Sequence, residues 1–84
     1  MNLEVITPLR TMSYEIAWLE LNTDVGNFVI QKGHAPTLLI LKQNDEIVFR
    51  LKNGKQESVF VPKGIAEITR ETATVVIQEV AKKE

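Results

Sequence analysis

Turn-forming residues interrupt this chain at a spacing of about eight to twelve residues, and this spacing limits what the chain can fold into. The apolar stretches between the turns have the length of strands, and none is a convincing amphipathic helix. The pair Asn53-Gly54 is the strongest hairpin signal, because both residues accept the positive φ angles of a type I′ turn. Residues 46–52 and 56–62 are therefore predicted to pair as antiparallel strands.

Further strands are expected wherever β-branched or alternating residues lie between turn signals. These are residues 3–7, 10–22, 28–30, 37–41, 65–69 and 73–80. In the longest of them, Ala17, Leu19 and Leu21 are expected to point one way. Tyr14, Ile16, Trp18 and Glu20 are expected to point the other way. A helix competes there, because Leu, Glu and Ala are good helix formers, but no N-cap precedes the stretch and turn residues follow it.

Two patterns predict how the strands are covered. The continuous apolar stretch Thr37–Leu41 is typical of a strand buried on both faces. If the core is filled by Leu19, Leu21, Phe49 and Leu51, five large side chains remain for an outer face that suits a partner. They are Tyr14, Ile16, Trp18, Val48 and Phe60. The alternatives are strands buried on both faces, or a register shifted by one residue, which would exchange the faces.

These elements predict an all-β fold, a two-sheet β-sandwich or flattened barrel, with residues 1–84 as one domain. The chain has no cysteine, which excludes disulfides and thiolate chemistry. Its net charge of −1 gives no indication of nucleic-acid binding. No apolar stretch approaches the roughly 20 residues that cross a bilayer, so membrane association is expected only through another protein.

The residues 26–37 form a corner bracketed by Gly26, Gly33 and Pro36, with the single histidine, His34, inside it. His34 is the only conventional general base, and no Gly-x-Ser-x-Gly sequence accompanies it. No phosphate-binding glycine loop is present either. A histidine that ties down a loop by hydrogen bonding is the favoured interpretation, and neither a metal nor a cofactor is expected.

The segment Gly26-Asn27-Phe28-Val29-Ile30-Gln31-Lys32-Gly33-His34-Ala35-Pro36 resembles the Gly-x-hydrophobic-Gly-hydrophobic-x-x-Gly-His-Ala-Pro segment of the epsilon subunit of F-type ATP synthases. Val5-Ile6-Thr7-Pro8 is similar to the start of that family, and Gly64-Ile65-Ala66-Glu67-Ile68 to its Gly-Gly-hydrophobic-x-Glu-Val stretch. The resemblance covers residues 3–80.

The resemblance implies a β-sandwich of about ten short, mostly antiparallel strands. It also implies a non-catalytic central-stalk (rotor) subunit that couples ion-driven rotation of the c-ring to the gamma subunit and to ATP synthesis. The expected partners are the gamma subunit, the polar loops of the c-ring and the rest of the F1 complex, without nucleic acid and without direct membrane insertion. The expected location is the cytoplasmic face of the inner, energy-coupling membrane.

The resemblance also assigns contacts residue by residue. Those to the c-ring fall on Val25, Gly26, Asn27 and Phe28. Those to gamma fall on His34, Ala35 and Pro36.

This sequence departs from the family pattern at several positions. Val29, Lys63 and Tyr14 stand where glycine is usual. Asn27 is uncharged where an acidic residue is common, so the resemblance does not support a charge-paired contact with the ring at this position. No C-terminal helical hairpin is expected, and therefore neither its inhibition of hydrolysis nor its ATP binding. The alternative function is a free-standing β-sandwich adaptor that binds another protein.

Overall fold

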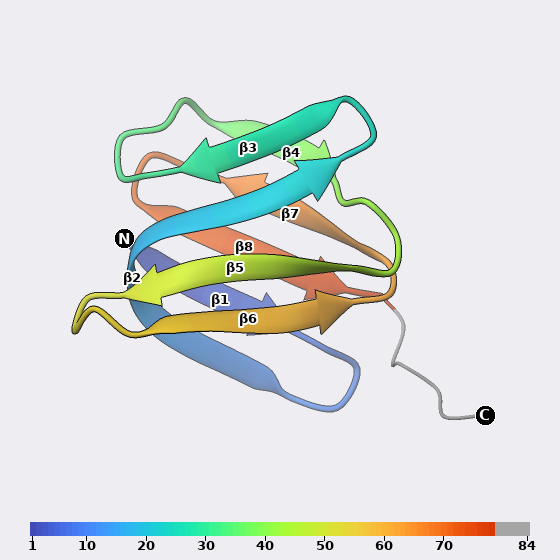
Figure 1. The fold of residues 1–84 in the computed structure, drawn as a ribbon, viewed down its shortest axis with the longest axis horizontal. Helices are drawn as coiled ribbons and strands as arrows, with labels where there is room; N and C mark the ends of the chain where they lie inside the picture. Colours follow the sequence, from blue (N-terminus) through green and yellow to red (C-terminus); the bar gives the residue numbers. More distant parts are fainter. Residues whose placement is uncertain (79–84) are drawn as a thin grey trace.

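The computed structural model describes residues 1–78, which form eight strands and, within this range, no helix (Figure 1). The strands are β1 (Asn2–Ile6), β2 (Thr11–Thr23), β3 (Gly26–Ile30), β4 (Thr37–Ile40), β5 (Asp45–Leu51), β6 (Gln56–Val61), β7 (Gly64–Ile68) and β8 (Thr72–Ile77). The predicted all-β fold is confirmed, with a strand count close to the expected one. The last strand was predicted over residues 73–80, and in the structure it ends at Ile77. Residues 79 and 80 of the predicted range lie outside the described residues. Within the described range no helix could span a membrane.

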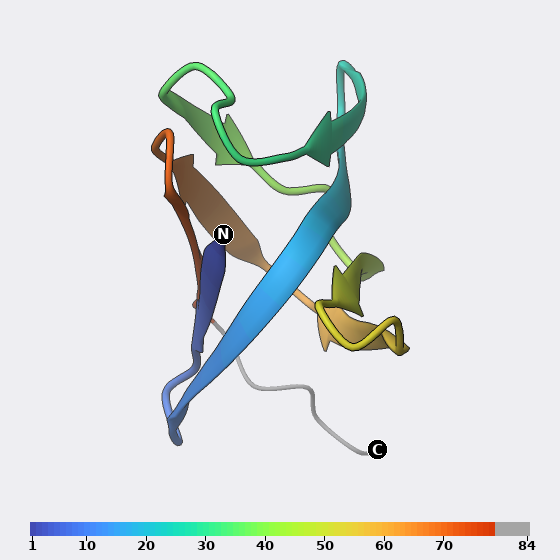
Figure 2. The ribbon, with the colours of Figure 1, turned by 90° about the vertical axis from the view of Figure 1, so that its left-hand side faces the viewer.

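The strands form two layers that share β2 (Figure 2). Sheet A contains β4, β7, β8, β1 and the first part of β2, in that order. Sheet B contains β3, the second part of β2, β5 and β6. Every pairing is antiparallel except that of β1 with β8, which is parallel. The long strand β2 passes from one layer to the other and therefore joins them covalently.

A bulge in β2 corrects the predicted alternation of this strand. The register with β5 shifts between Ile16 and Trp18, so that one extra residue stands in β2. Ile16 is consequently fully buried and Ala17 is exposed, the reverse of the expected orientation. Leu19 and Leu21 are buried as expected. Tyr14 also turns inward, and its ring lies 4.8 Å from that of Phe49.

The core lies between the two sheets, where alternate residues of most strands meet. Its largest fully buried side chains are Phe49, Leu3, Ile16, Leu19, Leu21, Ile30, Ile68, Val5, Val61 and Val75. The predicted core residue Leu51 is partly buried against this cluster. Three of the five side chains expected on an outer face do lie there: Trp18, Val48 and Phe60.

The predicted hairpin of β5 and β6 is confirmed, but its turn is not type I′. Gly54 has a φ of 95°, whereas Asn53 does not have a positive φ. The Gly54 N–H donates to the Leu51 carbonyl (2.8 Å) and the Leu51 N–H donates to the Lys55 carbonyl (2.7 Å). A single left-handed glycine that closes a longer loop is the common alternative to the two-residue turn.

Strand β4 was predicted to be covered on both faces, and this is wrong for the described residues. Leu38 is 64% exposed and Ile40 is 74% exposed, whereas Leu39 packs against the core. β4 is the edge strand of sheet A, paired only with β7 along its length. One face of β4 therefore meets the core and the other meets solvent.

Candidate partner-docking site

The turn between β2 and β3 carries the first set of predicted contact residues. The Thr23 hydroxyl donates to the Gly26 carbonyl (3.1 Å) and accepts a hydrogen bond from the Val25 N–H (3.2 Å). Gly26 has a φ of 147°, a conformation that favours glycine. The turn is thus held by the Thr23 hydroxyl, while Val25 is 87% exposed. Val25 is therefore presented at the tip of a fixed hairpin.

Asn27 and Phe28 follow this tip and face opposite ways. The Asn27 side-chain amide donates to the Glu20 carboxylate (3.0 Å) and to the Asn22 side-chain oxygen (2.9 Å). Phe28, paired with Leu21, is partly buried against the core. Of the four residues predicted to meet the c-ring, Val25, Gly26 and Asn27 are exposed, and Phe28 anchors the hairpin.

The corner after β3 carries the second set. The His34 ring Nδ1–H donates to the Ala35 carbonyl (2.8 Å), and the His34 backbone N–H donates to the Gln31 carbonyl (3.0 Å). This local bonding agrees with a histidine that ties down its own loop. The Gly33 N–H donates to the Arg70 carbonyl (2.7 Å). The corner is therefore fixed to the β7–β8 turn, and it presents Ala35 and Pro36 to solvent.

The two predicted contact sets lie at opposite ends of β3. In Figure 1 the β2–β3 turn is at the upper right and the corner of residues 31–36 is at the upper left. The corner also carries the chain from sheet B to sheet A, because β3 pairs with β2 and β4 with β7. The two sets can thus contact two different partners at the same time.

An apolar surface adjoins the corner, and sequence analysis missed it. The register places Ile40 opposite Ile65, and Ile65 opposite Val76. Val76 in turn lies opposite Ile6, so these side chains share the outer face of sheet A. We call these four residues and Leu38 the β4 face. The signal was present in the apolar stretch of residues 37–41, which predicts a strand covered on both faces.

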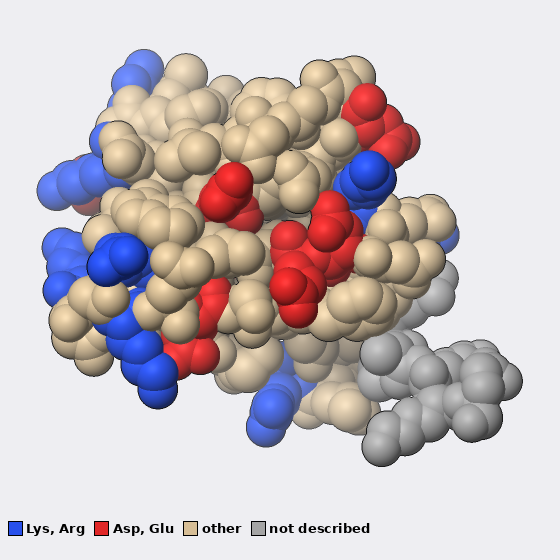
Figure 3. Space-filling view, in the orientation of Figure 1, with Lys and Arg blue, Asp and Glu red and all other residues tan. Residues whose placement is uncertain are grey.

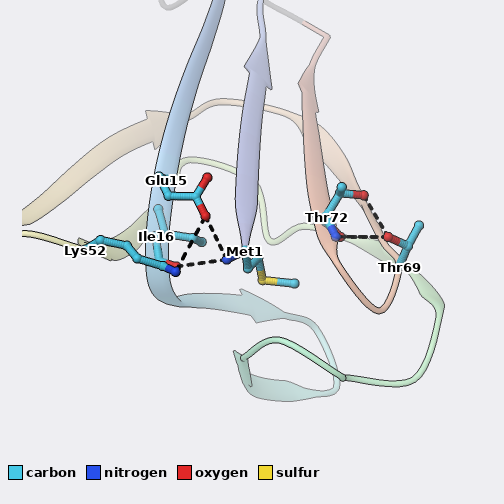
Figure 4. Close-up of polar contacts among 6 residues, drawn as sticks. All are labelled: Met1, Glu15, Ile16, Lys52, Thr69 and Thr72. Atoms are coloured by element: carbon cyan, nitrogen blue, oxygen red, sulfur yellow. Dashed lines mark hydrogen bonds and ion pairs between the residues drawn. The ribbon is translucent and has the colours of Figure 1, made fainter.

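Two carboxylates have lowered pKa values at the ends of the sandwich. The pKa of Glu15 is lowered by a hydrogen bond and charge attraction from the Met1 α-ammonium group (3.2 Å), and further by Lys52 (3.7 Å; Figure 4). The pKa of Asp45 is lowered by the Glu46 backbone N–H (2.8 Å) and then by the Asn22 side-chain amide (3.1 Å). Glu15 links the N-terminus and Lys52 to β2, and Asp45 links β5 to Asn22 of the same strand β2.

The β7–β8 turn, which the corner of residues 31–36 contacts through Gly33 and Arg70, is closed by two threonines (Figure 4). The Thr69 backbone N–H donates to the Thr72 carbonyl (2.9 Å), and the two hydroxyls lie 2.7 Å apart. The turn that the corner contacts is therefore itself held by hydrogen bonds.

Among residues 1–78 no group of three or more His, Asp or Glu side chains could hold a metal ion.

Comparison with known proteins gave a family and a fold. The chain matches the family model described as the ATP synthase delta/epsilon chain β-sandwich domain over residues 1–83. No curated protein sequence matched. Among solved structures the chain is similar to one in the central stalk and c-ring of the Tetrahymena thermophila mitochondrial ATP synthase, with a TM-score of 0.78 and 16% identity. This match covers 94% of the present chain and 63% of the Tetrahymena chain.

A second similar chain belongs to the OSCP/F1/c-ring structure of the Euglena gracilis mitochondrial ATP synthase, with a TM-score of 0.81 and 15% identity. This match covers 94% of the present chain and 51% of the Euglena chain. The present sequence thus spans between half and two thirds of these two structural relatives. The TM-scores show a shared fold, and at this low identity they show the fold alone. The family model, in contrast, extends over nearly the whole sequence. This chain therefore belongs to the ATP synthase delta/epsilon-chain β-sandwich family.

Proposed function

We propose that this chain is a non-catalytic central-stalk (rotor) subunit of an F-type ATP synthase. It couples ion-driven rotation of the c-ring to the gamma subunit, and so to ATP synthesis, on the cytoplasmic face of an energy-coupling membrane. The observation that carries the proposal is the β4 face, an exposed apolar surface beside the fixed corner of residues 34–36 in a member of a stalk-subunit family. Large contiguous apolar surfaces on a small protein mark docking sites.

The gamma subunit is proposed to cover the corner and the β4 face together. Pro36 directly precedes β4, so the exposed corner residues and the outward side chains Leu38 and Ile40 form one continuous surface. Burial of these two side chains against gamma would give the strand the second apolar cover that its sequence predicts. A stiff sandwich joined to the stalk in this way transmits torque without any bond-making chemistry.

Substitutions on this surface test the gamma contact. Leu38→Ser combined with Ile40→Ser should weaken binding to gamma at least tenfold, because each side chain contributes about 1–2 kcal/mol of apolar burial. Val29→Ser is the matched control, because Val29 is 52% exposed on the outer face of the other sheet. The measurement is titration of gamma with each variant, with circular dichroism to show that the fold is kept.

The corner is tested separately with His34→Ala combined with Pro36→Gly. These changes remove the ring hydrogen bond to Ala35 and the fixed φ that holds the corner in shape, so gamma should bind less tightly while the fold persists. Unchanged affinity would remove the corner from the interface. If the wild-type chain does not bind gamma at all, it is instead a free-standing adaptor that keeps the family fold.

The c-ring is proposed to meet the β2–β3 hairpin at the other end of β3. Val25→Cys and Asn27→Cys should each form a crosslink to a cysteine in the polar loop of the c-subunit in the assembled complex. Ser58→Cys on β6 is the control, because it is exposed but lies away from this hairpin. No crosslink from any of positions 25–28 would contradict this orientation.

A further inference from the structure

The outer face of sheet B carries apolar side chains on all four of its strands. Val29 on β3 is 52% exposed and Phe60 on β6 is 45% exposed. Trp18 on β2 and Val48 on β5 lie between them and are half-buried. Neighbouring strands are about 4.8 Å apart, so this surface extends over about 14 Å. It faces away from the β4 face, because the two sheets are the opposite layers of the sandwich (Figure 2).

A hollow opens in this surface beside β3. Its volume is 270 Å³, and it is lined by Trp18, Glu20, Val29 and Gln31. An indole ring and a valine form its apolar lining, and Glu20 supplies a carboxylate. One oxygen of that carboxylate, Oε2, is held by the Asn27 side-chain amide (3.0 Å). The hollow therefore combines apolar wall with a fixed negative charge.

This face carries two carboxylates, Glu20 and Glu46, and one cation, Arg50. Neither Glu20 nor Glu46 takes part in a salt bridge among residues 1–78. Arg50, on the same face, lies 6.0 Å from the centre of the Trp18 ring and donates to the Gly54 carbonyl (3.0 Å). Figure 3 shows acidic side chains over the middle of this face, several basic ones along its left margin and another beside the acidic ones at the right. The centre of the surface thus carries apolar side chains and two carboxylates outside any described salt bridge, with Arg50 beside Trp18.

We propose that the outer face of sheet B docks a basic amphipathic helix of a second partner protein. A lysine or arginine of that helix enters the hollow, where its aliphatic stem packs on Trp18 and Val29 and its charge meets Glu20. A second cation of the helix meets Glu46. A helix is about 10–12 Å across, which fits this width better than a single extended strand does. The proposal does not depend on gamma binding, which uses the opposite face.

The single tryptophan makes this surface directly observable, because Trp18 fluorescence reports on the hollow alone. The probes are two designed helical peptides with the same leucine face, one with lysines and the other with glutamates on the polar face. The lysine peptide should shift Trp18 emission to shorter wavelength in a saturable way. The glutamate peptide should not. No shift with the lysine peptide would overturn the proposal.

Paired variants separate docking in the hollow from general charge attraction. Glu20→Gln with Glu46→Gln should weaken binding of the lysine peptide about fivefold or more. Glu4→Gln with Glu67→Gln makes the same change in net charge on the outer face of sheet A, and should weaken binding less than twofold. Equal losses in the two double variants would overturn the proposal.

Gamma affinity distinguishes this surface from the one in the proposed function. It should stay unchanged in Glu20→Gln with Glu46→Gln, because gamma is expected on the other sheet. Loss of gamma binding in that variant would show that gamma itself occupies sheet B, and the proposal of a second partner would fail. If gamma still binds but the lysine peptide does not shift Trp18 emission, the proposal of a second partner fails and the proposed function stands.

Discussion

At the scale of single residues, the surroundings of Lys63 and Gly64 show why lysine can replace the first glycine of the family's glycine pair. A Cβ atom at Gly64 would lie 2.6 Å from the Val76 backbone carbonyl oxygen and 3.1 Å from Val61. The side chain of Lys63, by contrast, is exposed. The second glycine position of the family's pair therefore requires glycine here because the backbone of β8 is close, whereas the first position accommodates a lysine.

Asp45 shows how a single carboxylate links stability to pH. Its pKa is below the ordinary value of 3.8, because the Glu46 N–H and the Asn22 amide bond its ionised form. The ionised group therefore stabilises the fold above that value, and this stabilisation is lost as the pH falls through the lowered pKa. Asp45→Asn should lose less stability than the wild type between about pH 5 and about pH 2. Urea midpoints at several pH values measure this difference.

Asn22→Ala is the companion variant in the same experiment. It removes the weaker of the two donors, so its pH dependence should lie between those of the wild type and Asp45→Asn. Identical pH dependence in all three proteins would show that Asp45 does not contribute to the acid lability of the fold.

At the scale of elements, the bulge in β2 decides which residues are in the core. Ile16→Ala should destabilise the protein by about 2–5 kcal/mol, because it empties a fully buried site. Ala17→Ser, one residue further, should change the free energy of unfolding by less than about 0.5 kcal/mol, because Ala17 is exposed. Denaturant unfolding measures both. A larger loss of stability from Ala17→Ser than from Ile16→Ala would contradict the bulge, because it would mean that Ala17 and not Ile16 is in the core.

At the scale of the whole molecule, the pairing of β1 with β8 joins two strands from opposite ends of the described chain. Residues 2–6 lie beside residues 72–76, and β1 also pairs with the first part of β2. The middle of sheet A therefore forms only when distant segments meet, which is entropically costly and slow. The sandwich depends on β1 more than the shortness of this strand implies.

Deletion of residues 1–6 tests this dependence. The shortened chain should lose cooperative unfolding, because β8 and β2 lose their shared neighbour and the core loses Leu3 and Val5. Insertion of two glycines between Asn53 and Gly54 is the control, and it should cost about 1 kcal/mol or less because it only lengthens an exposed loop. A cooperative urea transition in the shortened chain would contradict the central role of β1.

Local patterns in the sequence determined most of the strands. Turn residues and β-branched stretches gave the approximate position of every strand and the pairing of β5 with β6. The family segment around His34 located the corner and the hairpin before it. These features are local, since each depends on neighbours within a few residues, and so they can be predicted without knowing the fold.

The tertiary structure alone decided which faces are buried. The bulge after Ile16 lies where β2 passes from its pairing with β1 in sheet A to its pairing with β5 in sheet B. No local sequence pattern indicates that one strand belongs to both sheets. The exposure of Leu38 and Ile40 follows from the place of β4 at the edge of sheet A, whereas their sequence is that of a covered strand. Burial is a property of the neighbours that a strand acquires on folding, and these come from distant parts of the chain or from a partner. A sequence can therefore specify its strands while leaving open what covers them.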